Sequence, residues 1–128
     1  MYGYSAGALL ALRAATTSSR ITGLVVLEPP LHDDTDPRPD PLTVELAELV
    51  ARGDRAEAVR RFHEAIGVPV ELLADLAASS AWGPMVEVSH TVVYDCMISD
   101  AVDRRLLADV TQPTLVLDSA GSGDDLSG

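Results

Sequence analysis

The chain has 128 residues, 47% of them hydrophobic and 23% charged, which is typical of a globular domain with one core. Its net charge of −11 excludes nucleic acid and anionic membrane surfaces as favourable partners. The single cysteine, Cys96, excludes an internal disulfide, and no apolar run is long enough for a membrane span. Because the first residues also lack the basic segment of a signal peptide, we expect a cytoplasmic protein.

The first thirty residues predict a helix followed by a strand. Residues 6–17 are rich in Ala and Leu, both strong helix formers, and a Thr/Ser cluster ends that helix. Residues 21–27 read Ile-Thr-Gly-Leu-Val-Val-Leu, without polar alternation after the glycine. Such a run is typical of a strand covered on both faces in a parallel sheet. Pro29 and Pro30 end it, because proline cannot donate to a sheet ladder.

A loop and then a change of period follow the strand. Residues 31–41 are dense in Pro and Asp, which predicts an exposed loop that acts as a hinge. After the loop the apolar spacing becomes helical, with Leu42, Leu46, Leu49 and Val50 on one face.

Further helices are predicted up to about residue 108. Asp54 begins a capping pattern and therefore opens a second helix. Residues 85–98 indicate one more helix, although their β-branched content leaves a strand open. Asp100 is expected to cap a last short helix over residues 101–109.

Residues 114–118, Thr-Leu-Val-Leu-Asp, predict a second short buried strand. Two buried strands separated by helices indicate an α/β fold with parallel strands. A pair of strands alone is marginally stable, so both strands need further neighbours.

The motif with the clearest chemistry lies at the N-terminus, where Gly3, Ser5 and Gly7 match G-x-S-x-G. In one interpretation this is a nucleophile elbow, a strained strand-to-helix turn whose glycines let strand and helix pack closely. Met1 and Tyr2 would then end the incoming strand. In the other interpretation Ser5 is the N-cap of an ordinary helix. The strand that returns directly after the helix favours the elbow, since a βαβ crossover requires it.

With this context, residues 3–7, Gly-Tyr-Ser-Ala-Gly, resemble the nucleophile elbow of the α/β-hydrolases. The two predicted strands resemble the sixth and seventh strands of that family, and the helices between them resemble its inserted lid. The resemblance covers the whole chain but only the middle of the family's fold, so it implies a partial α/β-hydrolase fold and a fragment. It implies three parts: residues 1–30 with the elbow, its helix and a core strand; the helical lid, 31–110; and a core strand with a truncated acid loop, 111–128.

The resemblance also implies roles for individual residues. Ser5 is the nucleophile, and the N–H of Ala6 forms half of the oxyanion hole. The acid stays open between two positions. The family usually places it after strand seven, where Ser122 has the usual spacing and Asp124 lies slightly further on. Some lipase-like members place it after strand six, where this chain has Glu28.

In this hypothesis the chain lacks the histidine base of the triad. None of the three histidines, His32, His63 and His90, lies where the family places its base. The resemblance therefore implies a catalytic histidine outside the chain, and we expect the 128-residue chain itself to be inactive. Tyr4, beside the nucleophile, and His90 with Tyr94, in a lid helix, are expected to contact the substrate.

These observations predict a serine hydrolase that acts on an ester or another acyl or carbonyl small molecule. The alternative is a non-catalytic α/β-hydrolase-like binding module. No spacing of His, Cys or carboxylates predicts a metal site, and no glycine-rich fingerprint predicts a nucleotide cofactor. Exposed strand edges predict possible self-association of the chain.

Overall fold

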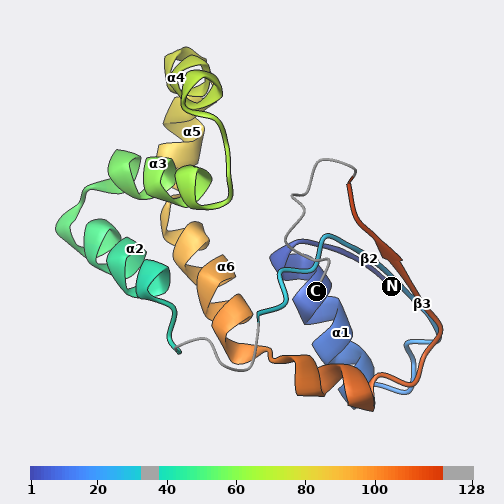
Figure 1. Cartoon of the computed structure of the whole chain (residues 1–128). Helices are drawn as coiled ribbons and strands as arrows, with labels where there is room; N and C mark the ends of the chain where they lie inside the picture. Colours follow the sequence, from blue (N-terminus) through green and yellow to red (C-terminus); the bar gives the residue numbers. More distant parts are fainter. Residues whose placement is uncertain (33–37, 120–128) are drawn as a thin grey trace. The chain divides into compact units, whose positions relative to one another are not determined.

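The computed structural model describes residues 1–32 and 38–119, and the chain divides into two compact units (Figure 1). The sheet unit comprises residues 1–35 and 101–128, and the helical unit comprises residues 36–100. In the described residues, no helix is long and apolar enough to cross a membrane.

The sheet unit contains three parallel strands in the order β1 (Tyr2–Tyr4), β2 (Leu24–Leu27) and β3 (Thr114–Leu117). The predicted strand over residues 21–27 begins three residues later than expected. The short β1 confirms the strand end predicted at the N-terminus and gives β2 a neighbour on each side. Tyr4, Leu27 and Leu117 are in register, so the three strands end level with one another.

Helix α1 (Ala6–Thr17) packs against β1 and β2 and supplies most of the core of the sheet unit. Leu9 and Leu12 on the helix are buried together with Leu24 and Val26 on β2. Each such side chain contributes about 1.5–3 kcal/mol when it leaves water. The short 3₁₀ helix η1 (Arg104–Asp109) also contacts α1.

The opposite face of the sheet is apolar and largely open within the described residues. The register aligns Tyr2 with Val25 and Leu115, and alternation along a strand puts them on one face. Tyr2 is 62% exposed and Leu115 is 55% exposed. The strand predicted over residues 114–118 is confirmed as β3, but its predicted burial is wrong, because α1 covers β1 and β2 while β3 lies at the end of the strand order. Self-association through this sheet stays a prediction.

The helical unit contains five helices in the residues that the structure describes. Leu46 and Leu49 are buried with Ala58 and Val93, and Leu42 and Val50 pack against this cluster. The predicted apolar face of the first helix is thereby confirmed. The helices are α2 (Pro41–Arg52), α3 (Arg55–Ala65), α4 (Val70–Ala78), α5 (Trp82–Glu87) and α6 (His90–Ala101).

Three predicted details of the helices are wrong. Residues 85–98 are not one helix, since α5 ends at Glu87 and α6 begins at His90. Asp54 is the N-cap residue of α3, which confirms the predicted helix start, but its side chain does not form the expected capping hydrogen bond. Asp100 lies inside α6, and Asp103 caps η1 instead by accepting a hydrogen bond from the Arg105 N–H at 2.8 Å.

Within the helical unit, Asp100 joins the two ends of the helical segment. One of its carboxylate oxygens accepts a hydrogen bond from the Asp40 N–H at 3.1 Å, across 60 residues of sequence. The Asp40 side chain in turn accepts from the Leu42 N–H at 2.7 Å and caps α2.

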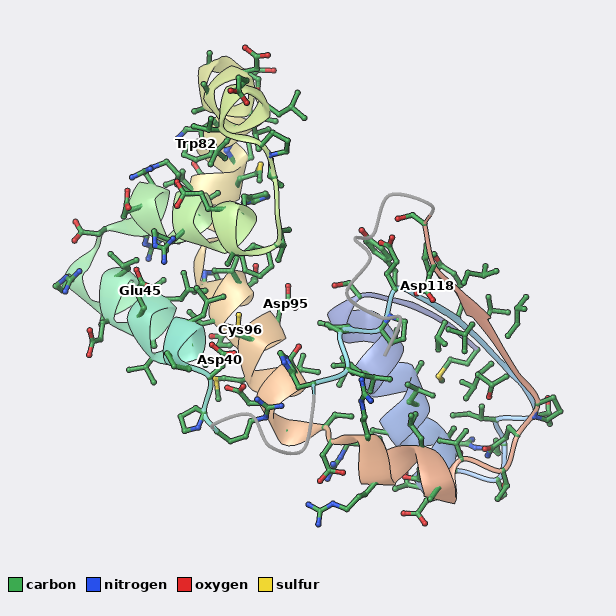
Figure 2. The ribbon with its side chains drawn as sticks, in the orientation of Figure 1. Asp40, Glu45, Trp82, Asp95, Cys96 and Asp118 are labelled. Atoms are coloured by element: carbon green, nitrogen blue, oxygen red, sulfur yellow. The ribbon has the colours of Figure 1, made fainter. Side chains whose placement is uncertain are left out.

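An ion pair between α2 and α3 yields a first, small prediction. Arg61 donates two hydrogen bonds to Glu45, at 2.8 and 3.0 Å, and they lower the pKa of the Glu45 carboxyl (Figure 2). A lowered pKa in the folded state stabilises the fold above the ordinary pKa near 4.5, and this stabilisation is lost as the pH falls through the folded-state value. Glu45→Gln is therefore expected to lower the Tm slightly at pH 7, and the difference from the parent chain should vanish in acid. Thermal unfolding followed by circular dichroism between pH 3 and 7 measures it, with Glu48→Gln on the same helix as the control.

The thiol of Cys96 on α6 yields a second prediction. Burial raises its pKa to about 11, and the carboxylates of Asp100, Asp95 and Asp40 add to the effect (Figure 2). We therefore expect iodoacetamide to alkylate the folded chain slowly at pH 8 and much faster in urea. Intact mass against time measures both rates. Because the unfolded thiol ionises first, stability should be full below about pH 9 and fall as the pH rises towards 11. Equal alkylation rates with and without urea would contradict the burial of this thiol.

Candidate functional site

Ser5 occupies the turn between β1 and α1 in a strained backbone conformation, with φ 52° and ψ −127°. Such a conformation costs about 1–3 kcal/mol in a residue with a side chain and persists only where the surrounding structure enforces it. The Ser5 N–H donates to the Leu27 carbonyl at 2.9 Å, and the Ser5 carbonyl accepts from the Ala8 N–H at 2.8 Å. The Ser5 side chain forms no capping hydrogen bond, so its interpretation as an ordinary N-cap is wrong.

Gly3 allows the turn to close. A Cβ at this position would lie 2.6 Å from the Ala8 Cα and 2.8 Å from its nitrogen, and closer still to the Gly7 carbonyl oxygen. Strand and helix therefore approach too closely for any other residue. The same role was expected of Gly7, but a Cβ there would meet nothing within 4 Å, so close packing does not require that glycine.

Ala6 is the first residue of α1 and is buried. The N–H groups of the first helical turn have no acceptor within the helix, because no preceding helical carbonyl exists. They also lie at the positive end of the helix dipole. The Ala6 N–H is therefore suited to stabilise a negative charge that develops beside Ser5.

Glu28 is the second strained residue, with φ 48°, and directly follows β2. Its N–H donates to the Leu117 carbonyl at 2.9 Å. Since Tyr4 pairs with Leu27, Ser5 and Glu28 are the next residues on two adjacent strands. Adjacent strands lie about 4.8 Å apart. The two residues with positive φ other than glycine in the described chain thus come together at the carboxyl edge of the sheet.

The Glu28 carboxylate is held from the end of β3. Its Oε1 accepts a hydrogen bond from the Ser119 N–H at 3.2 Å and another from the Ser119 hydroxyl. Ser119 was not among the site residues predicted from the sequence. The available signal was its place one residue after Asp118, just beyond the third strand, because the carboxyl ends of parallel strands lie at one edge of the sheet.

The other predicted site residues fall into three groups. Tyr4 ends β1, next to Ser5, and is exposed. His90 and Tyr94 lie together on α6 in the helical unit, with ring centroids 5.7 Å apart in an edge-to-face arrangement. Asp124 lies outside the described residues.

Two of the three histidines, His63 and His90, lie in the helical unit. His63 lies on α3, where its Nδ1 is 2.7 Å from the Val59 carbonyl oxygen and its ring packs edge-to-face against Phe62. These contacts are those of a structural helix residue. His32 lies in the loop after β2. Among residues 1–32 and 38–119, no group of three His, Cys, Asp or Glu side chains is arranged to hold a metal ion.

A parallel sheet with helices defines an α/β protein. The strained Ser5 and Glu28 follow strands at its carboxyl edge, the edge at which open α/β sheets bind ligands. Comparison with solved structures identifies the family. The chain is similar to an α/β hydrolase from Sphaerobacter thermophilus DSM 20745, with a TM-score of 0.75 and 38% sequence identity over 94% of this chain. The chain belongs to the α/β-hydrolase fold family.

The similarity covers only part of the solved hydrolase. The chain spans 49% of the length of the solved hydrolase. No protein-family model and no curated protein matches the sequence.

Proposed function

We propose that this chain carries the nucleophile of a serine hydrolase, with Ser5 attacking the acyl or carbonyl carbon of a small-molecule ester or a related compound. The observation that supports this most is the strained turn at Ser5, where Gly3 lets strand and helix approach closely. A nucleophile elbow stores strain in the same place, between a strand and the helix that follows. The Ala6 N–H then supplies one of the donors for the oxyanion.

Glu28 is the acid in this proposal. Its carboxylate comes from the strand next to that of Ser5, and its backbone is strained like that of Ser5. An acid of this kind does not take the proton; it orients the imidazole base and stabilises the imidazolium that forms. Asp124, the other candidate, enters the proposal if Glu28 can be replaced without loss.

The helical unit serves as the lid in this proposal. Tyr94 is exposed on α6 beside His90, and a tyrosine–histidine pair offers both apolar surface and a hydrogen-bonding tip to a substrate. Tyr4, next to the nucleophile, offers the same. The Leu- and Val-rich helices favour an uncharged, largely apolar substrate.

A fluorophosphonate probe tests the nucleophile, because it reacts with activated serines. The chain is labelled with and without added imidazole as an external base, and the adduct is located by mass spectrometry. We expect little labelling alone and at least a roughly hundredfold acceleration by imidazole at Ser5, the size of a typical general-base effect. Ser5→Ala should remove the adduct, and Ser19→Ala, at an exposed position after α1, should leave it unchanged.

Each outcome of this experiment is decisive for one part of the proposal. Labelling that persists in Ser5→Ala, or the absence of any acceleration, would overturn Ser5 as the nucleophile and favour the non-catalytic binding module. Rapid labelling of Ser5 without imidazole would support the nucleophile but overturn the inactivity of the chain. In that case His90 and His63 become the first candidates for the base.

A further inference from the structure

Glu28 is anchored to β3 by both its backbone and its side chain. The Glu28 N–H donates to the Leu117 carbonyl, which continues the β2–β3 ladder by one residue. Two residues further along, the Ser119 N–H and the Ser119 hydroxyl both donate to Oε1 of the Glu28 carboxylate. A carboxylate contributed by the second strand is thus held by a residue that lies just beyond the third.

We propose that Ser119 is a positioning residue for Glu28, an inference that rests on the proposed function of Ser5 and Glu28. Glutamate has several rotatable bonds, so fixing such a side chain costs rotamer entropy. Two donors from one residue, converging on one oxygen, select a single orientation of the carboxylate before a base arrives. This preorganisation lowers the entropy cost of fixing the Glu28 carboxylate when the base binds.

The chemistry of the two donors suits an acid that must keep its charge. An N–H and a hydroxyl are neutral, so these bonds hold the carboxylate without cancelling its negative charge. Both bonds are made to Oε1 of the carboxylate. Hydrogen bonds to a charged acceptor are worth more than those between neutral groups, so loss of the hydroxyl should have a measurable effect.

The test combines the imidazole-dependent labelling of Ser5 with carbon-13 NMR of the Glu28 carboxyl group. Ser119→Ala removes the hydroxyl and keeps the N–H, and we expect it to slow labelling by about tenfold and to shift the Glu28 carboxyl resonance. Ser119→Thr restores a hydroxyl at an exposed position, and it should restore both readouts. The Tm of each variant is measured in parallel, because a purely structural role would change the Tm and would not depend on the hydroxyl of Thr.

A double-mutant cycle with Glu28→Gln completes the test. If Ser119 acts through Glu28, Ser119→Ala should have no further effect on labelling in the Glu28→Gln background. The proposal would be overturned if Ser119→Ala slowed labelling equally in the parent chain and in the Glu28→Gln background. It would also be overturned if the Glu28 carboxyl resonance were unchanged in Ser119→Ala. If no variant is labelled at Ser5, the proposed function fails, and the NMR comparison still decides separately whether Ser119 holds Glu28.

Discussion

Gly3→Ala is expected to prevent stable folding of the sheet unit. The added Cβ would lie within 3 Å of two backbone atoms of Ala8, and backbone cannot turn aside as a flexible side chain can. Relief requires β1 to separate from α1, and this separation would also disturb the hydrogen bond from the Ser5 N–H to Leu27. We expect a cost of more than about 3 kcal/mol, a large part of the stability of a small domain.

Amide hydrogen exchange in α1 and β2 measures this effect, and the chain provides a matched control. Gly7→Ala makes the same chemical change four residues later, where a Cβ meets nothing within 4 Å. Alanine is also the better helix former by about 1 kcal/mol, so Gly7→Ala should leave the described fold intact or slightly more stable. Equal protection in the two variants would show that strand and helix do not approach as closely as described.

Leu46→Ala is expected to destabilise the helical unit by about 2–5 kcal/mol. Leu46 is 0% exposed and lies in the cluster with Leu49, Ala58 and Val93. Truncation removes buried methyl groups and leaves a cavity, because the surrounding helices relax only partly. Trp82 is the single tryptophan and lies in α5, so its fluorescence during urea unfolding reports on the helical unit.

Leu72→Ala is the control for this measurement. It is the same substitution in the same unit, but Leu72 is 58% exposed on α4. A surface substitution of this kind changes stability by about 0.5 kcal/mol or less. Comparable losses in both variants would contradict the placement of Leu46 in the core.

Local sequence signals predicted the N-terminal half of the sheet unit well. The Ala- and Leu-rich run over residues 6–17 gave the bounds of α1 because helix propensity and the Thr/Ser stop agree. The G-x-S-x-G pattern located the strained turn because a strand and a helix that meet this closely leave no space for a side chain at position 3.

Features that depend on pairing between distant residues were missed. Whether an apolar strand is buried depends on what covers it, so Leu115 and Val116 gave no local sign that β3 is exposed. The hydrogen bonds from Ser119 to Glu28 join residues 91 positions apart and depend on the register of β2 and β3. Asp54 is a local example. The capping pattern correctly predicted where α3 starts, but it did not predict that the side-chain capping bond is absent.

The pairing of β2 with β3 also determines the order in which the chain can fold during synthesis. Val26 pairs with Val116, so the third strand does not exist until the whole helical unit has been translated. Until then β2 exposes one side of its backbone to the surrounding solution. Parallel pairing across so long a separation forms slowly, because the intervening chain must first be brought together. The unpaired edge of β2 is therefore open to wrong pairing and aggregation from the emergence of β2 until β3 has been made.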